Sequence, residues 1–154
     1  MTIKIRPATP TDIDSIMTLM PRLAEFELPE NRKPEYFWQE DAKVLQEWAT
    51  GEKSNVFVLV GVDEREKILG VTIVSMGDEF FSHEPSAHLE VVTVAKEADG
   101  SGLGRRLIVA SEAEAKKRGA LSMSLHVVKN NHRARHVYEK IGYTEELIRA
   151  IKFL

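Results

Sequence analysis

The sequence predicts one α/β domain that spans residues 1–154 and contains a mixed sheet. Three observations support this prediction. Apolar residues alternate with polar ones in several segments and recur at helical spacing in others, and the two kinds of segment are interleaved along the chain. The length of 154 residues, with 43% hydrophobic residues, suits one domain that buries its own core. The chain contains no cysteine, which excludes disulfide scaffolds, thiolate zinc sites and cysteine nucleophiles.

The first half of the chain is expected to form a short strand, two helices and a hairpin. Apolar positions from Ile13 to Ala24 follow helical spacing, and Pro21 should kink or shorten that helix because proline has no main-chain N–H to donate. Val56–Val62 is a continuous apolar run, which is typical of a strand covered on both faces. The expected boundaries are a strand at 3–6, helices at 10–25 and 34–49, a loop at 26–33, and strands at 56–62 and 67–76.

The second half is expected to alternate strands with helices. Residues 121–127 alternate strictly between apolar and polar, which predicts a strand. Gly119 should end the helix before it, and Asn130 or Asn131 should cap the helix after it. The expected boundaries are a loop at 77–86, strands at 88–95, 121–127 and 143–154, a glycine-rich loop at 97–102, and helices at 102–118 and 131–141.

Charge is unevenly distributed along the chain. The net charge is −3, so non-specific nucleic-acid binding is not expected. Residues 1–99 carry −9 and residues 100–154 carry +6. This division indicates either one cationic and one anionic small partner or a chance surface composition, and the sequence favours neither. The longest apolar run is too short to span a membrane, and the first residues lack the apolar core of a signal peptide, so we expect a cytoplasmic protein without membrane contact.

The passage from Val94 to Arg105 is the strongest functional signal. Glycines at 100, 102 and 104 allow a ligand to approach the main chain, and the loop opens into a helix whose first N–H groups favour an anion. Arg105 and Arg106 add positive charge. The alternative is a glycine turn that only packs a helix on a strand. A Walker loop is excluded by the missing Gly-Lys-Ser/Thr, and the dinucleotide fingerprint lacks both its third glycine and its acidic residue.

These residues resemble the acetyl-CoA loop of the GCN5-related N-acetyltransferase (GNAT) family, which reads Arg/Gln-x-x-Gly-x-Gly/Ala after a strand that ends in valine. Val94 and the pair of glycines at 102 and 104 match, whereas Asp99 stands where the family has Arg or Gln. A second family motif, Asn-x-x-Ala-x-x-x-Tyr-x-x-x-Gly-Phe, is matched at Asn131, Ala134, Tyr138, Gly142 and Tyr143. The resemblance implies a single GNAT domain over 1–154 with a central sheet that splays beside the strand ending at Val94.

The resemblance also implies a reaction, namely transfer of acetyl from acetyl-CoA to a primary amine of a small molecule or peptide, by direct attack in a ternary complex. Such a site must remove a proton from the amine, polarise the thioester and stabilise the thiolate. The residues expected to bind acetyl-CoA are Val92, Val94, Asp99, Gly100, Ser101, Gly102, Leu103, Gly104, Arg105, Asn131, Ala134 and Tyr138. Asn131 has a plain helix cap as its alternative role.

Tyr138 resembles the general acid of the family, with an ordinary core tyrosine as the alternative. Glu90 and His88 lie on one face of the strand at 88–95, because they are two residues apart. Glu90 is the expected base or amine ligand, and His88 and Glu27 are further expected substrate contacts. For each of these, a solvated surface residue is the alternative.

Other functions stay open on the sequence alone. A CoA-binding regulatory module without catalysis and a nucleotide-dependent oxidoreductase would both use the glycine loop. His132 and His136 are four residues apart on one helix, but no third ligand lies near them in the sequence, so no metal is expected. The resemblance is also compatible with a homodimer.

Overall fold

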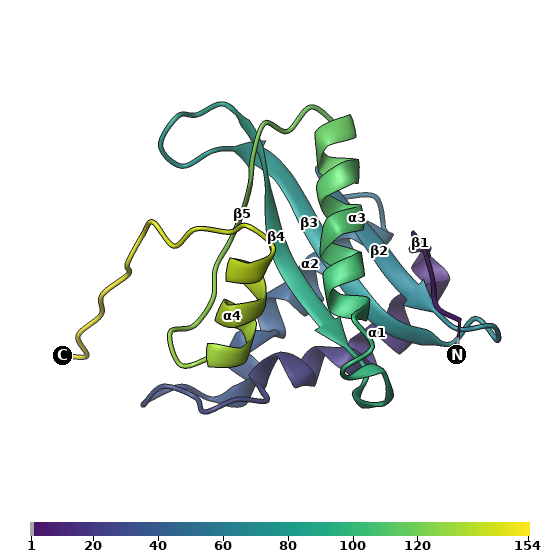
Figure 1. Cartoon of the computed structure of the whole chain (residues 1–154), viewed down its shortest axis with the longest axis horizontal. Coiled ribbons are helices and arrows are strands. Elements are labelled where there is room, and N and C mark those ends of the chain that lie inside the picture. Colours follow the sequence, from purple (N-terminus) through teal and green to yellow (C-terminus); the bar gives the residue numbers. More distant parts are fainter. Residues whose placement is uncertain (1) are drawn as a thin grey trace.

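The computed structural model describes residues 2–154 as a five-stranded sheet with helices on both faces (Figure 1). Strand order follows the sequence, and neighbouring strands are antiparallel except that β5 runs parallel to β4. The predicted α/β fold with a mixed sheet is confirmed. The strands are β1 (Lys4–Pro7), β2 (Val56–Val62), β3 (Ile68–Asp78), β4 (Pro85–Val94) and β5 (Met123–Leu125).

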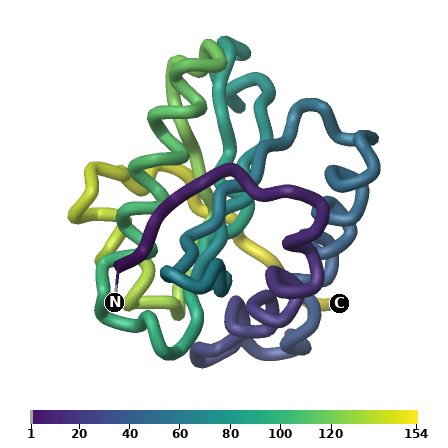
Figure 2. The backbone as a smooth tube through the Cα atoms, turned by 90° about the vertical axis from the view of Figure 1, so that its right-hand side faces the viewer, coloured from purple at the N-terminus to yellow at the C-terminus, as the bar shows by residue number. Residues whose placement is uncertain are grey.

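Helices cover the two faces of the sheet unequally. Figure 2 shows the sheet between α3 on one side and α1 with α2 on the other. The helices are α1 (Ile13–Leu19), α2 (Gln39–Ala49), α3 (Leu103–Lys117) and α4 (His132–Lys140), with the 3₁₀ helices η1 (Pro10–Asp12), η2 (Met20–Ala24), η3 (Pro34–Phe37) and η4 (Lys96–Ala98). Within residues 2–154, no helix is both long enough and apolar enough to cross a bilayer.

Local sequence accounts for most of these elements. The helix expected from residue 10 tightens into η2 after Leu19, because Pro21 cannot continue the α-helical hydrogen bonds. The helix expected at 34–49 is interrupted at Trp38, whose φ of −142° is not helical. Every residue of β2 is buried, as the continuous apolar run predicts.

Two glycines allow α3 to lie close to the sheet. A Cβ atom on Gly61 would lie 2.7 Å from Leu103 Cδ1, and one on Gly70 would lie 2.9 Å from both Leu103 Cδ2 and Leu107 Cδ1. Leu103 and Leu107 are the buried anchors of α3. The close approach fixes the N-terminus of α3 beside the end of β4, where the glycine loop joins the two elements.

The sheet splays between β4 and β5. These strands pair only from Ala87 to Leu89, opposite Met123 to Leu125. The pairing of β4 with β3 is irregular at the same level: Ile73 pairs with Val91 and Val74 with Leu89, so Glu90 has no partner residue. An extra residue in one strand bends that strand. Beyond Leu89 the two strands separate, and the predicted splayed sheet is confirmed.

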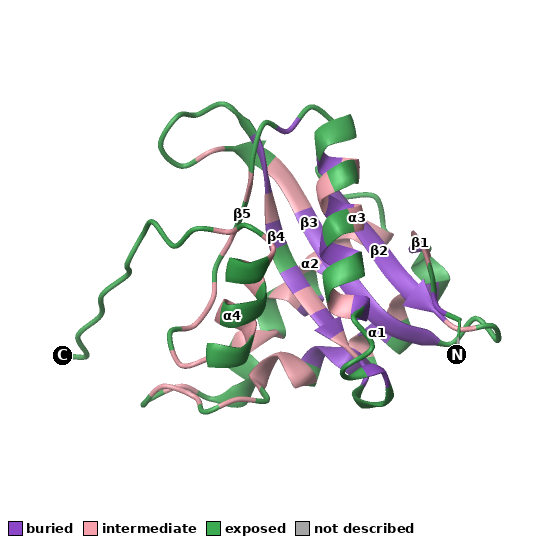
Figure 3. Ribbon diagram, in the orientation of Figure 1, coloured by how far each residue is buried: buried purple, intermediate pink, exposed green. Residues whose placement is uncertain are grey.

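Three predicted elements differ from those in the structure. The hairpin between β3 and β4 is longer than expected, since its strands extend to Asp78 and from Pro85. The strand predicted at 121–127 is reduced to β5, because β4 offers pairing to only three residues. The strand predicted at 143–154 is wrong: residues 144–154 are irregular and exposed (Figure 3). Six of these eleven residues are apolar, but no neighbouring strand in residues 2–154 pairs with them, and a strand requires such a partner.

Candidate functional site

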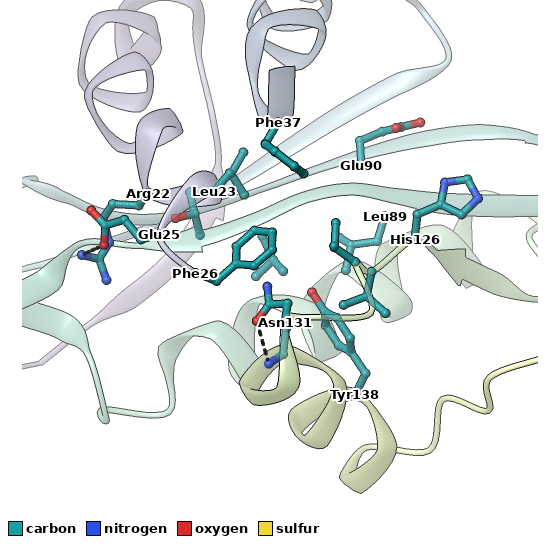
Figure 4. A pocket seen from close by; sticks show the side chains of 15 residues that line it. Arg22, Leu23, Glu25, Phe26, Phe37, Leu89, Glu90, His126, Asn131 and Tyr138 are labelled. Carbon is teal, nitrogen blue, oxygen red and sulfur yellow. Dashed lines mark hydrogen bonds and ion pairs between the residues drawn. The ribbon is translucent and has the colours of Figure 1, made fainter. Parts of the chain in front are cut away.

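A cavity of about 220 Å³ lies where β4 and β5 separate (Figure 4). Its walls come from five parts of the chain. η2 and the following loop supply Arg22, Leu23, Glu25 and Phe26; η3 supplies Phe37; β4 supplies Leu89, Glu90, Val92 and Thr93; residues 126–128 follow β5; and α4 with its cap supplies Asn131, Ala134 and Tyr138. The splay therefore brings together Glu90, Val92, Asn131, Ala134 and Tyr138 of the predicted site.

Tyr138 directs its hydroxyl into this cavity (Figure 4). Burial raises the pKa of Tyr138 to about 12, because the phenolate is poorly solvated there. A tyrosine hydroxyl is already protonated at neutral pH at its ordinary pKa of 10.0, and burial extends the protonated range to higher pH. Tyr143, whose ring centroid lies 6.1 Å away, donates its hydroxyl to Glu112 at 2.7 Å and is not among the cavity-lining residues. The two tyrosines thus have different environments.

Glu90 lines the opposite side of the cavity. Its carboxylate accepts a hydrogen bond of 2.6 Å from the Ser75 hydroxyl on β3, and it points away from the Tyr138 hydroxyl (Figure 4). Asp41, in the first turn of α2, lies close enough to Glu90 to repel it. Burial, and then the charges of Glu90 and Glu40, raise the pKa of Asp41 to about 7. This side of the site is strongly acidic, and no sequence pattern indicated Asp41.

Two histidines lie beside Glu90. The rings of His88 and His126 are 4.7 Å apart, and His88 Nδ1 lies 2.8 Å from the Ser124 hydroxyl. Burial lowers the pKa of His88, with His126 acting in the same direction and Glu90 opposing it. It is His126, and not the predicted His88, that lines the cavity. Alternation in 121–127 placed His126 on a polar face, but nothing in the sequence showed that this face borders a cavity.

The predicted contact Glu27 is replaced in the cavity wall by Glu25 of the same segment. The main-chain carbonyl of Glu27 accepts a hydrogen bond of 3.2 Å from Asn130 Nδ2, which ties the loop at 25–27 to the residues before α4. Asn131 accepts from the Ala134 N–H at 3.2 Å and so caps α4, while its side chain also lines the cavity. The hydrogen bond that caps α4 thereby fixes the position of the Asn131 side chain in the cavity wall.

The glycine loop presents several free main-chain donors. Within the described chain, the N–H groups of Gly100, Gly102, Gly104 and Arg105 make no hydrogen bond. Gly100 and Gly102 have φ of +76° and +81°, and a Cβ on either would meet no other atom within 4 Å, so the space before them is open. Leu103 adds no free donor to the loop, because its N–H donates to Ser101 Oγ at 3.2 Å. Its side chain is buried in the core. This cradle suits a diphosphate at a helix N-terminus.

Arg22 connects this loop to η2. Its Nη2 lies 3.0 Å from both carboxylate oxygens of Asp99, its Nη1 donates to Glu25 at 2.9 Å, and its Nε donates to the Val94 carbonyl at 2.7 Å. Val94 therefore uses its carbonyl within the protein, whereas Val92 lines the cavity. No sequence pattern indicated Arg22, since its partner Asp99 is 77 residues away.

Comparison with known proteins agrees with this geometry. The profile of the acetyltransferase (GNAT) family matches residues 20–143. The chain belongs to this family. The N-terminal acetyltransferase A complex catalytic subunit ard1 of Schizosaccharomyces pombe is 30% identical over 135 residues, which is 87% of this chain and 68% of that protein. The mycothiol acetyltransferase of Streptosporangium roseum is 38% identical over 68 residues, 44% of this chain but only 20% of that protein.

Among solved structures, a tetramutant of the BH1408 protein from Bacillus halodurans superposes with a TM-score of 0.75 at 24% identity, covering 98% of this chain and 99% of that one. This likeness shows the GNAT fold over nearly the full described length. In the part of the chain that the structure describes, no three His, Asp or Glu side chains form a group that could hold a metal ion.

Proposed function

We propose that this GNAT protein is an N-acetyltransferase that moves the acetyl group of acetyl-CoA to a primary amine, and that residues 1–154 act as one domain. The observation that carries the proposal is the position of the two GNAT motifs in the fold. The loop before α3 presents free N–H groups, and the cavity beside the separated part of β4 receives the hydroxyl of Tyr138.

The residues present fit the coenzyme. The N–H groups of Gly100, Gly102, Gly104 and Arg105 would bind its diphosphate, and the open space before the two left-handed glycines allows the phosphates to approach. Val92, Asn131 and Ala134 would line its pantetheine arm, as an added strand beside β4. When bound, acetyl-CoA supplies an acetyl thioester, and every other contribution comes from the protein.

Two groups of this chain would divide the proton transfers. A primary amine has an unperturbed pKa of ~10.4 and must lose a proton before it attacks. Glu90, hydrogen-bonded to Ser75, would accept that proton directly or through water. As the nitrogen–carbon bond forms and the carbon–sulfur bond breaks, Tyr138 would donate its proton to the sulfur. The second proton that the nitrogen then loses would pass through water and restore the Tyr138 hydroxyl. The Tyr138 hydroxyl carries the donated proton at neutral pH, since its pKa lies well above 7.

The acceptor side of the cavity favours a cation with an apolar part. Glu90 and Glu25 supply negative charge, and Phe26 and Phe37 supply aromatic surface, with ring centroids 5.5 Å apart. Asp41 lies behind Glu90 and adds to the acidic potential. We propose an amine-bearing small molecule or peptide as the acceptor. This matches the acidic front of the chain, and the +6 region from residue 100 matches the phosphates of CoA.

The test is release of free CoA thiol from acetyl-CoA across a panel of amines that includes a polyamine, an amino-acid amide, an aminoglycoside and a peptide N-terminus. We expect acceptor-dependent release with at least one of them, and none without acceptor. Tight CoA binding with no release on any amine would contradict catalysis and indicate a CoA-binding regulatory module. A rise in melting temperature with NAD, and none with acetyl-CoA, would overturn the coenzyme assignment.

A further inference from the structure

A short segment spans the gap between β4 and β5. Residues 22–27 lead from η2 into the loop that follows it, and four of these six residues line the cavity (Figure 4). β4 lines the cavity on one side of the gap, and residues between 126 and 138 line it on the other. Hydrogen bonds attach the 22–27 segment to both of these sides.

Arg22 attaches the beginning of this segment to the β4 side. Its Nε donates to the carbonyl of Val94, the last residue of β4, at 2.7 Å, and its Nη2 lies 3.0 Å from both carboxylate oxygens of Asp99. The Arg22 side chain is only 20% exposed, and partly buried charges are screened less by solvent than exposed ones. The beginning of the segment therefore has a fixed position relative to β4.

Asn130 attaches the end of the segment to the other side. Its Nδ2 donates to the main-chain carbonyl of Glu27 at 3.2 Å. Because Asn131 caps α4, the side chain of Asn130 is free to make this contact. The carbonyl of Asn130 accepts from the His132 N–H at 3.0 Å, which holds the turn before α4. Asn130 and Glu27 are 103 residues apart, so no local pattern indicates their bond.

Phe26 lies between the two attached ends. Its ring meets that of Phe37 edge to face, with centroids 5.5 Å apart and an interplanar angle of 81°, and both residues line the cavity. This geometry is favourable for an aromatic pair. The Glu25 N–H donates to the Arg22 carbonyl, and the Phe26 N–H donates to the Ala24 carbonyl, which shapes the turn that carries Phe26. The position of this aromatic wall therefore depends on the attachments at both ends of the segment.

We propose that Asn130 is a positioning residue for the acceptor: its bond to Glu27 keeps Phe26 against Phe37, and this aromatic pair binds the apolar part of a primary amine. The inference rests on the proposed function, because it concerns the acceptor wall of the same cavity. It also narrows the acceptor to an amine with an apolar body. Burial of apolar surface stabilises such a contact, whereas a polar chain would lose its hydrogen bonds to water there.

The kinetic consequence is specific to the acceptor. An apolar contact holds the bound amine equally before and during the reaction, so its loss raises KM for the amine and leaves kcat unchanged. Only an amine with an apolar body should show this rise. Hexylamine and 2-(2-aminoethoxy)ethanol are suitable probes, because both are unbranched primary amines of equal length and only hexylamine has an apolar chain.

The test compares Asn130→Ala with Asn55→Ala. The control removes the same kind of bond, from Asn55 Nδ2 to the Met76 carbonyl at 3.2 Å, and Asn55 does not line the cavity. The two substitutions should change the melting temperature by similar amounts. We expect Asn130→Ala to raise KM for hexylamine about fivefold. It should leave kcat, KM for the polar amine and the Kd of CoA in calorimetric titration at wild-type values. Asn55→Ala should match wild type in all four quantities.

A second variant tests whether Asn130 acts through Phe26. Phe26→Ala should raise KM for hexylamine at least as much as Asn130→Ala does. Asn130→Ala added to Phe26→Ala should have no further effect, because residues that act as one unit are not additive. A further rise in the double variant would contradict the proposed role of Asn130.

Three results would overturn the inference and leave the proposed function standing. They are a KM for hexylamine in Asn130→Ala equal to that in Asn55→Ala, an equal rise in KM for both amines, and weaker CoA binding, which would place Phe26 against the coenzyme. Acetylation of other amines by wild type, but not of hexylamine, would have the same meaning. Absence of thiol release with every amine would instead overturn the proposed function and the inference with it.

Discussion

Arg22 of η2 and Asp99, which lies just before the glycine loop, form an ion pair, with Arg22 Nη2 3.0 Å from both carboxylate oxygens. The pair accounts for an acidic residue at a position where the GNAT motif has Arg or Gln. In this chain the positive charge beside the glycine loop comes from Arg22 of η2, and not from residue 99. Because Arg22 neutralises its charge, the Asp99 carboxylate is compatible with the phosphate binding that we propose for the adjacent loop.

We predict that Arg22→Gln raises KM for acetyl-CoA about tenfold, because an unpaired Asp99 then repels the diphosphate. The double variant Arg22→Gln/Asp99→Asn should recover most of this loss. Arg118→Gln, which removes an arginine paired with Glu114 far from the slot, is the control and should leave KM unchanged. Initial rates against acetyl-CoA concentration measure all of these. A double variant as weak as the single one would show that the charge of Asp99 is not responsible.

Gly102→Val should weaken acetyl-CoA binding at least about tenfold, because the side chain occupies the open space before the loop. The left-handed φ of +81° also strains any side chain there. Gly51→Val controls for strain, since Gly51 has φ of +84° and equally open surroundings but ends α2. The two substitutions should lower the melting temperature by similar amounts. Only Gly102→Val should lower the affinity for acetyl-CoA in calorimetric titration. Equal affinities in the two would remove the loop from coenzyme binding.

Tyr138→Phe should lower kcat about a hundredfold and change KM for acetyl-CoA little, since a general acid acts in the transition state. Tyr143→Phe is the matched control. It breaks the bond to Glu112 and should lower the free energy of unfolding by about 1 kcal/mol while kcat is retained. Steady-state kinetics and thermal melting separate the two effects. An unchanged kcat in Tyr138→Phe would exclude it as the acid.

Glu90→Gln should raise KM for the amine or flatten the dependence of kcat on pH, because the carboxylate would no longer hold the cation or accept its proton. Ser75→Ala, which removes the 2.6 Å bond to Glu90 but keeps the charge, should have a smaller effect of the same kind. The measurement is the pH–rate profile with the best acceptor. A Glu90→Gln profile identical to wild type, with the same KM, would exclude both roles.

Asp41 gives the protein a specific pH dependence of stability. Its pKa is raised in the folded state to about 7 from an ordinary value of 3.8. The folded chain therefore binds the proton more tightly than the unfolded chain, so this group lowers stability as pH rises from about 4 to about 7. Asp41→Asn should melt higher than wild type at pH 8 and at the same temperature at pH 4.

Asp63 serves as a control because its pKa is shifted in the direction opposite to that of Asp41. Main-chain N–H groups of Lys67 and Arg65 bond to its carboxylate and lower its pKa, so its contribution is present at neutral pH and is lost in acid. Asp63→Asn should melt lower than wild type at pH 8. Melting curves from pH 4 to pH 9 measure both variants. A higher melting temperature of Asp41→Asn at pH 4 as well as at pH 8 would contradict the raised pKa.

Local patterns were sufficient for the elements that position the site. The apolar run at 56–62 and the glycines before α3 predicted the buried strand and the loop, because these depend on neighbouring residues. Tyr138 was found through a motif within one helix. Arg22 and Asp41 were missed, since each matters only through a partner on another element, and no local pattern encodes such a pair.

The wrong strand at 143–154 has a different cause. Alternating apolar residues show that a segment is suited to a sheet, but not whether a neighbouring strand is present to pair with it. The same limit applies to β5, which keeps only three paired residues of the seven predicted. Both errors lie at the β5 end of the sheet, where β5 pairs only with β4 within residues 2–154.

The most direct measurement is a crystal structure of the protein with acetyl-CoA. We predict that the diphosphate lies about 2.7–3.2 Å from the main-chain nitrogens of Gly102, Gly104 and Arg105, and that the thioester sulfur lies beside the Tyr138 hydroxyl. Coenzyme bound outside the space between β4 and β5, or with its diphosphate away from this loop, would contradict it.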